Sequence, residues 1–301
     1  MHILHIDTGR EMRGGQRQAL LLMRCLRDSG HSTELLAHLG SALWKEARSL
    51  DFAVRPVGLG TLWVRSRNAD LVHAHDARAH TFAAIASRRP FVVSRRVAFG
   101  VKLNPLSRRK YRRARRFLAV SQFVAKQLEL AGIASNKIDV VYDGVDTGAS
   151  HKRDGAANPL IVTLKSDDPL KGRDLVEQAA HIAGVPVLFS QDLSNDLRRA
   201  SLFVYITRSE GLGSAALLAM SFSVPVVASR VGGLPEIVIH GETGLVVGNK
   251  AEEIAAAMLQ VNRNPELGRK LGQNGRRLVE QQFTLKKMVE GTLASYRRAL
   301  A

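Results

Sequence analysis

Residues 207–248 read TRSEGLGSAALLAMSFSVPVVASRVGGLPEIVIHGETGLVVG, and this stretch decides the fold. A glycine-rich turn at 211–214 precedes an apolar run at 215–220 that predicts a helix. The free N–H groups at the start of a helix, together with the helix dipole, favour a bound phosphate. Because glycine has no side chain, a ligand can approach this backbone closely. We therefore expect a phosphate-binding turn here.

A second glycine turn follows the next predicted strand. The β-branched run at 224–228 predicts a short buried strand, and GGLPE at 232–236 predicts a turn that opens another short helix. Two glycine turns therefore follow two consecutive strands. In an open sheet of parallel strands, ligands bind at the edge where such strands end. The sequence thus predicts an α/β domain with a ligand site at that edge.

The composition indicates a globular protein with room for two domains. The chain has 301 residues, 45% of them hydrophobic, and a single cysteine, Cys25, whose helical surroundings favour a packing role over a reactive one. One cysteine forms no disulfide within the chain, which suits a reducing compartment. We recognise no charged leader and no apolar run of membrane-spanning length. We expect a cytoplasmic protein, with a peripheral position on the inner face of the membrane as an alternative.

Positive charge is concentrated in the first half of the chain. Residues 1–150 hold 25 Lys and Arg against 12 Asp and Glu, whereas residues 151–301 hold 19 against 15. Ten of the cations lie within residues 95–116, interleaved with apolar side chains such as Phe99 and Tyr111. The charge alone does not indicate nucleic-acid binding, because no recognised motif is present and aromatic residues are few.

The basic segment has two interpretations. We expect it either to dock on an anionic membrane surface or to bind an acidic acceptor, because cations near such a surface are attracted to it. The alternative is a solvated helix face without a partner. The cations on which the first interpretation rests are Arg108, Arg109, Arg112 and Arg113.

The pattern of the chain predicts two α/β domains. Seven strands separated by helices are expected in the first half, at 3–7, 33–38, 53–57, 71–74, 91–94, 117–120 and 138–142. Four more are expected in the second half, at 160–164, 185–189, 202–206 and 224–228. Crossovers of this length join parallel strands. Residues 147–159 lack periodicity and predict a linker, and helices are expected at 250–262, 265–282 and 285–300.

An ordered set of motifs resembles the retaining glycosyltransferases of family 4. The motifs are RGGQRQ at 13–18, AVSQFVAKQL at 119–128, VVYDGVD at 140–146, PLKG at 169–172, EGLGSAALLAM with PVVAS, and VGGLPEIV with HGETGLVV. The resemblance implies a GT-B fold, in which two Rossmann-like parallel-sheet domains face each other across a cleft. The domains would be an acceptor-side domain at 1–150 and a nucleotide-sugar domain at 151–284, with a helix at 285–301 that crosses back to the first domain.

The resemblance also implies a donor site. Lys165 and Lys171 match the basic pair that holds the pyrophosphate, and Glu210 matches an acid that binds the donor sugar. Cations and N–H donors at this place would stabilise the charge that grows on the leaving diphosphate. Solvated lysines and a helix-capping glutamate are the alternatives. The positions that match donor-binding residues are Gly14, Gly15, Gly211, Leu212, Gly213, Ser214 and Leu218.

The chain departs from the family pattern at several positions. Leu218 stands where a second glutamate usually binds the ribose, and Arg95 or Arg96 stands where a histidine is frequent. An arginine cannot act as a base, although it can hold an anionic group. His75 and Asp76, which follow the predicted strand at 71–74, are candidates for the acceptor side. The segment between Lys171 and Glu210 is also short by about one strand and helix.

Two functions of different class remain open from the sequence. The first is a retaining, metal-independent hexosyltransferase that moves a sugar from a nucleotide-sugar to a glycan of the cell envelope, a lipid-linked acceptor or another acidic acceptor. The second is a catalytically weak GT-B protein that binds a nucleotide-sugar or a partner enzyme. We expect no cofactor and no metal, because the adjacent carboxylates Asp167 and Asp168 are typical of a solvated loop.

Overall fold

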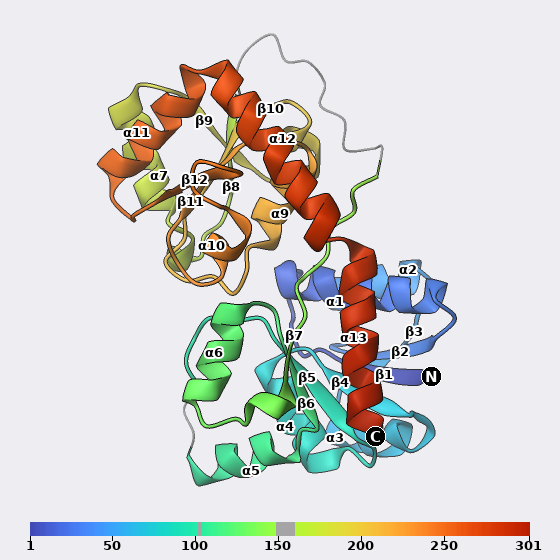
Figure 1. Ribbon diagram of the computed structural model, residues 1–301. Helices are drawn as coiled ribbons and strands as arrows, with labels where there is room; N and C mark the ends of the chain where they lie inside the picture. The colour runs from blue at the N-terminus through green and yellow to red at the C-terminus, as the bar shows by residue number, and fades with distance from the viewer. Residues whose placement is uncertain (102–103, 149–159) are drawn as a thin grey trace. The chain divides into compact units, whose positions relative to one another are not determined.

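The computed structural model describes residues 1–101, 104–148 and 160–301, and the chain divides into two compact units (Figure 1). The first unit comprises Met1–Asp143 and Leu285–Ala301, and the second comprises Gly144–Thr284. Most of the predicted linker, residues 149–159, lies outside the described residues. Each unit contains one sheet whose strands are all parallel, so the predicted fold class of two Rossmann-like α/β domains is confirmed.

The first unit holds a seven-stranded sheet in the order β3-β2-β1-β4-β5-β6-β7. The chain proceeds outward from β1 to β3 and then returns to add β4 on the other side of β1, so the strand order reverses between β1 and β4. Ligands bind at the carboxyl ends of strands beside such a reversal. The strands are β1 (His2–Ile6), β2 (Ser32–Ala37), β3 (Ala53–Pro56), β4 (Leu71–Ala74), β5 (Phe91–Arg95), β6 (Arg116–Ala119) and β7 (Ile138–Val140).

Helices and short 3-10 turns connect these strands. They are α1 (Gly14–Asp28), α2 (Ala42–Ser49), α3 (Leu59–Arg65), η1 (Ser66–Asn68), α4 (Ala77–Ala86), α5 (Pro105–Arg113), α6 (Gln122–Leu130) and η2 (Ser135–Lys137). Ser121 caps α6 through a bond from the Val124 N–H to its hydroxyl, at 3.1 Å. The basic segment forms α5, where Tyr111 packs inward against His80 and Phe117. Tyr111 is therefore a core residue and does not share the surface of the cations.

Helix α13 (Leu285–Leu300), at the carboxyl end of the chain, is part of the first unit. Its residues Met288, Val289 and Tyr296 are buried in the same apolar cluster as Leu22 of α1 and Val92 of β5, and Figure 1 shows α13 beside α1. Burial of a large apolar side chain contributes roughly 1.5–3 kcal/mol, so this helix is an integral layer of the first domain.

The second unit holds a five-stranded sheet in the order β12-β11-β10-β8-β9. Its order reverses between β8 and β10, which are neighbours in the sheet. The strands are β8 (Leu160–Leu164), β9 (Val187–Ser190), β10 (Ala200–Tyr205), β11 (Val226–Ser229) and β12 (Gly244–Val247). The helices are η3 (Pro169–Lys171), α7 (Arg173–Ala183), α8 (Leu193–Leu197), α9 (Ser214–Ser221), α10 (Leu234–Ile237), α11 (Ala251–Asn262) and α12 (Pro265–Gln282).

Candidate active site

Three side chains form a compact polar cluster at the carboxyl edge of the second sheet. The Lys171 ammonium lies 2.8 Å from Oε2 of Glu210 and 3.2 Å from the Tyr205 hydroxyl, which donates to the same Oε2. About a quarter of the Lys171 side chain and 16% of the Glu210 side chain are exposed. The structure therefore brings two of the three predicted catalytic residues together, and it adds Tyr205, which the sequence analysis missed.

Backbone contacts fix the orientation of Glu210. Its second carboxylate oxygen, Oε1, accepts the Gly211 N–H at 3.1 Å. Gly232, which has φ of +56°, lies directly against the Glu210 backbone, where an added Cβ would be 1.7 Å from the Glu210 carbonyl oxygen. No other residue fits there, so the second predicted glycine turn holds the first in place. Since a carboxylate oxygen accepts more than one bond, Oε1 can still receive a sugar hydroxyl.

Lys171 lies in the PLKG turn, which follows β8 at the point where the strand order of the second sheet reverses. Asp168 caps the short η3 turn by accepting the Leu170 N–H at 3.0 Å. Gly172 follows with φ of +57° and lies against Ile206 at the end of β10, so a side chain here would clash with that backbone. Arg208 ties the two segments together through an ion pair with Asp174, at 2.6 Å. The turn is thus fixed to the strand that precedes Glu210.

The turn at 211–214 opens α9 as the sequence predicted. Gly213, with φ of +112°, is the N-cap residue, and Ser214 is the first residue of the helix. The free N–H groups of this first turn therefore face the carboxyl edge of the sheet. Leu212 is buried in the core, whereas Leu218 on α9 is only half-buried. Leu218 is thus available for replacement without opening the core.

Lys165 lies immediately after β8, the strand beside β10. Its backbone N–H bonds to the Ser190 carbonyl at 2.9 Å, and its side chain is exposed. Within residues 1–101, 104–148 and 160–301, the structure gives the Lys165 ammonium no ion pair. Lys165 therefore differs from Lys171, whose charge is held by Glu210.

Tyr205 remains neutral beside this carboxylate. Burial raises the pKa of the Tyr205 hydroxyl well above its ordinary value, and the adjacent Glu210 charge raises it further. A neutral hydroxyl can donate, so Tyr205 holds Glu210 as a charge-assisted partner. The cluster thus contains one cation, one anion and one fixed donor.

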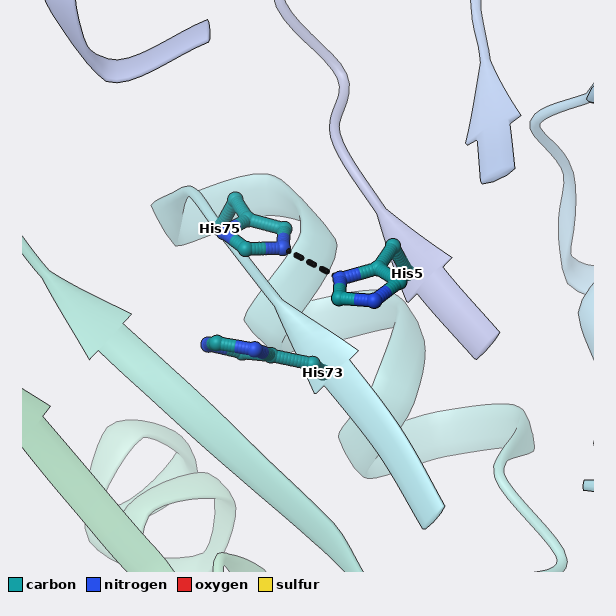
Figure 2. Close-up of side chains that lie close together, drawn as sticks. All are labelled: His5, His73 and His75. Carbon is teal, nitrogen blue, oxygen red and sulfur yellow. Dashed lines mark hydrogen bonds between the residues drawn. The ribbon is translucent and has the colours of Figure 1, made fainter. Parts of the chain in front are cut away.

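Three buried histidines form a second polar group, at the carboxyl edge of the first sheet (Figure 2). His5 on β1 lies opposite His73 on the neighbouring strand β4, and His75 follows two residues later. Figure 2 shows the bond between His5 Nδ1 and His75 Nε2, which is 2.9 Å long. His73 bonds through Nδ1 to the Tyr296 hydroxyl of α13, at 2.6 Å, and through Nε2 to Ser94, at 2.8 Å.

The proton positions in this histidine chain follow from Arg96. Its Nη1 lies 3.3 Å from His75 Nδ1, and its Nε donates to Asp143 at 3.1 Å. A guanidinium only donates, so His75 Nδ1 accepts, and the proton of the neutral ring is on Nε2. Nε2–H then donates to His5 Nδ1. Burial, with the nearby Arg96 charge, lowers the pKa of His5 to about 3 and the pKa of His73 and His75 well below the ordinary value, so all three are neutral.

Among the described residues, the three histidines form a group that could hold a metal ion, because their ring nitrogens lie within 4.8 Å of one another. The hydrogen bonds argue against this use. His75 Nε2 carries a proton and therefore has no free lone pair, and both nitrogens of His73 already have partners. The Arg96 guanidinium also repels a cation. The arrangement fits a fixed hydrogen-bond chain that orients Arg96.

The remaining acceptor-side candidates have different contacts in the structure. Asp76 caps α4 by accepting the Arg78 and Ala79 N–H groups, and its carboxylate also accepts the Thr8 hydroxyl, so it joins the start of α4 to the loop after β1. Arg95 points away from the histidines and donates to the Phe99 carbonyl. Of the two arginines, only Arg96 lies beside His75, at the end of β5.

Gly14 and Gly15 begin α1, at the same edge of the first sheet as Arg96. An added Cβ at Gly15 would lie 3.8 Å from Cδ of Arg96, which is ordinary contact. A pocket at this edge is lined by Arg96, Asp143, Ser94, Val120, Val141 and Thr292. The predicted approach of the two glycines to a donor held by the other domain is not tested by the geometry of either unit.

Two family models match the chain. The model described as "Glycosyl transferases group 1" matches residues 166–278, and the model described as "Glycosyltransferase Family 4" matches residues 12–149. The chain is a glycosyltransferase of the family 4 type. The first model covers the cluster around Glu210, and the second covers the histidine chain except His5.

Relatives and solved structures agree with this assignment of the glycosyltransferase. An uncharacterized glycosyltransferase of Methanocaldococcus jannaschii is 24% identical over 84% of this chain and 82% of its own length. The N-acetyl-alpha-D-glucosaminyl L-malate synthase of Bacillus anthracis is 35% identical, but over 31% of this chain and 25% of its own length. A crystal structure of Anabaena HepE in complex with UDP matches with a TM-score of 0.86 at 18% identity, covering 98% of this chain and 99% of HepE.

Proposed function

We propose that this glycosyltransferase moves a sugar from a nucleoside-diphosphate sugar to an acceptor, with retention of the anomeric configuration and without a metal ion. The observation that carries the proposal is the Lys171, Tyr205 and Glu210 cluster beside the first turn of α9. It places a cation, free N–H groups and an oriented carboxylate at one edge of the sheet. HepE has been crystallised with UDP-glucose, and that structure matches this chain with a TM-score of 0.85.

Two kinds of group at this site would bind different parts of the donor. Lys165, Lys171 and the N–H groups of Gly213 and Ser214 would hold the diphosphate and stabilise the negative charge that grows as the bond from the sugar to the phosphate oxygen breaks. Glu210 would accept bonds from hydroxyls of the sugar. Because Lys171 is paired with Glu210, a bound diphosphate would share the Lys171 charge with this carboxylate.

Retention is supported by the bonds that already engage the carboxylates at the carboxyl edge of the first sheet. An inverting transfer needs a group that removes the acceptor proton on the face opposite the leaving group. At the described carboxyl edge of the first sheet, Asp7 is bonded to Gly9 and Gln16, Asp76 caps α4, and Asp143 is paired with Arg96. In a retaining transfer the departing phosphate oxygen can take the proton on the same face. Fixed cations at the diphosphate would likewise replace a metal ion.

The acceptor is proposed to be a glycan, a lipid-linked molecule or another acidic molecule held by the first domain. Arg96 is the residue best placed to contact an anionic group of the acceptor, because Asp143 and His75 hold its guanidinium beside a pocket and beside the start of α1. Its side chain is 14% exposed, so part of it is accessible.

A melting-temperature screen with nucleoside diphosphates and their sugars tests this function. A ligand at about 100 times its dissociation constant adds about 2.7 kcal/mol to the free energy of unfolding. We expect a rise in melting temperature with at least one nucleoside diphosphate, no loss of this rise with EDTA, and release of that diphosphate from its sugar donor. Binding without any turnover would instead favour the catalytically weak GT-B protein, for which the apolar Leu218 is the supporting observation.

A further inference from the structure

One face of the first domain combines exposed apolar side chains with unpaired arginines. Trp63, Val64 and Ile85 are 45%, 54% and 61% exposed. The first two lie on α3 and the third on α4, and these helices pack together. Three exposed arginines lie among them, and in the part of the chain that the structure describes none of the three pairs with a carboxylate. They are Arg67, Arg88 and Arg113.

Contacts between these side chains make the face continuous. The guanidinium groups of Arg67 and Arg88 lie over the Trp63 ring, 4.0 Å and 4.7 Å from its centroid. Arg113 of α5 donates to the Ala84 carbonyl, directly beside Ile85. Figure 1 shows α3, α4 and α5 at the same end of the domain. We call the six residues Trp63, Val64, Ile85, Arg67, Arg88 and Arg113 the arginine–tryptophan face.

The segment that contains α4 and α5, which contribute Ile85 and Arg113 to this face, carries only positive charge. From residue 77 to residue 128 the sequence has 14 Lys and Arg and no Asp or Glu. The exposed side chains of Arg109 and Arg112 on α5 add to it. Burying an apolar patch against a neutral protein would desolvate these arginines without a partner, which is unfavourable. The occupant should therefore be negatively charged.

We propose that the arginine–tryptophan face docks on the surface of an anionic lipid bilayer. Tryptophan rings are favoured at the boundary between headgroups and acyl chains, and arginines beside them contact the lipid phosphates. An acidic soluble polymer would satisfy the arginines but would leave Trp63, Val64 and Ile85 exposed. Among the described residues, no helix is both long enough and apolar enough to cross a membrane, so attachment would be peripheral. This proposal does not depend on the sugar donor.

The face lies away from the carboxyl edge that holds Arg96. Trp63 precedes β4, and Arg88 precedes β5, so both lie near the amino ends of these parallel strands. His75 and Arg96 follow the same two strands at their carboxyl ends. A bilayer on the arginine–tryptophan face would therefore leave the edge that carries Arg96 uncovered.

Tryptophan fluorescence provides a direct test, because the chain has two tryptophans and the other, Trp44, is 9% exposed in the core. In a Trp44→Phe variant, all of the tryptophan fluorescence comes from Trp63. With vesicles of phosphatidylcholine and phosphatidylglycerol at low salt, we expect a blue shift of its emission and quenching by brominated lipids. Vesicles of phosphatidylcholine alone should give neither. If the vesicles sediment the protein but the emission of Trp63 is not shifted, the apolar side chains do not insert into the bilayer and the proposal is overturned.

Two matched pairs of charge reversals distinguish the contribution of this face to vesicle binding from the contribution of the net charge. Arg109→Glu with Arg112→Glu should reduce the vesicle partition coefficient by at least about tenfold, since each cation near an anionic surface contributes about 1 kcal/mol. Arg269→Glu with Lys270→Glu, on α12 of the second unit, changes the net charge equally and should have a much smaller effect. Equal losses in both variants, no vesicle binding at low salt, or binding only to soluble polyphosphate would each overturn the proposal. Nucleotide binding is measured in parallel and should be unchanged.

Discussion

The carboxyl edges of the two sheets use polar side chains in opposite ways. In the second domain, Lys171 and Glu210 are charged, partly exposed and paired with each other. In the first domain, the three histidines are neutral and buried, His5 and His75 are bonded to each other, and His73 is bonded to Tyr296 and Ser94. A partly exposed ion pair can exchange partners with a ligand, whereas a buried neutral chain keeps one geometry. The difference assigns ligand chemistry to the first group and positioning to the second.

The largest effect is expected from removing the cations of the open cluster. Lys165→Ala with Lys171→Ala should weaken nucleoside-diphosphate binding by about 100-fold or more, because each charge-assisted bond contributes roughly 1.5–3 kcal/mol. Calorimetric titration measures the change, and circular dichroism verifies the fold. Arg269→Ala with Lys270→Ala removes two exposed cations from the same unit and should bind normally. An unchanged affinity in the first variant would contradict the assignment of the lysines.

Removing the anion should separate turnover from binding. Glu210→Ala should reduce kcat by about 10- to 100-fold, because bonds of a carboxylate to sugar hydroxyls are worth roughly 1.5–3 kcal/mol. Nucleoside-diphosphate affinity should hold or rise, since Lys171 loses its partner and becomes available to phosphate. Single-turnover kinetics and calorimetry on the same variant distinguish the two. Equal losses of both quantities would show that Glu210 serves the diphosphate.

A tyrosine-to-phenylalanine substitution in each of the two regions tests directly whether one region binds ligand and the other positions side chains. Tyr205 donates to Glu210 in the open cluster, and Tyr296 bonds to His73 in the buried chain. Tyr205→Phe should reduce kcat by about fivefold through the loss of one hydrogen bond of about 1 kcal/mol. Tyr296→Phe should lower the free energy of unfolding by a similar amount and leave kcat within about twofold. A reversed pattern would mean that the two edges have been assigned the wrong roles.

Much of the fold could be predicted because it depends on periodicity. The seven strands of the first sheet and four of the second follow from β-branched runs between helical segments. β12 was missed because it begins with Gly244, directly after a turn that contains Gly241, and a glycine at its start looks like part of that turn. α8, with five residues, is too short to show a period.

The candidate site could be predicted only where a motif has a fixed spacing. Lys171 and Glu210 were found, whereas Tyr205 was not, because an aromatic residue in a buried strand looks like a core residue. The histidine group could be predicted only in part. His75 was a candidate from the sequence, but His5 and His73 lie inside strands, and only the register between β1 and β4 brings these two residues together. Asp76 also caps α4, a role that the sequence analysis did not assign to it, although a carboxylate directly before a helix is a usual cap.

The neutral state of the histidine chain predicts sensitivity to acid. Because the folded pKa of these rings lies below the unfolded value near 6.5, they contribute stability above pH 6.5 that is lost as the pH falls toward the folded pKa, about 3 for His5. Each such histidine adds about 1.4 kcal/mol per pH unit to the slope. His75→Gln can accept from Arg96 and donate to His5 but does not titrate, so denaturant unfolding should show a shallower slope. His181→Gln, at an exposed site on α7, should leave the slope unchanged.

A small effect is expected at Leu218, the residue that departs from the family pattern. Leu218 is half-buried on α9, whereas its neighbour Leu217 is fully buried. If the ribose of the donor lies over this helix, Leu218→Glu should tighten nucleoside-diphosphate binding by about fivefold, the value of one added hydrogen bond of about 1 kcal/mol. Leu217→Glu is the matched control and should unfold the domain, because its charge would be buried without a partner. Weaker binding by a folded Leu218→Glu variant would show that the ribose is held elsewhere and that the open cluster recognises the diphosphate and the sugar alone.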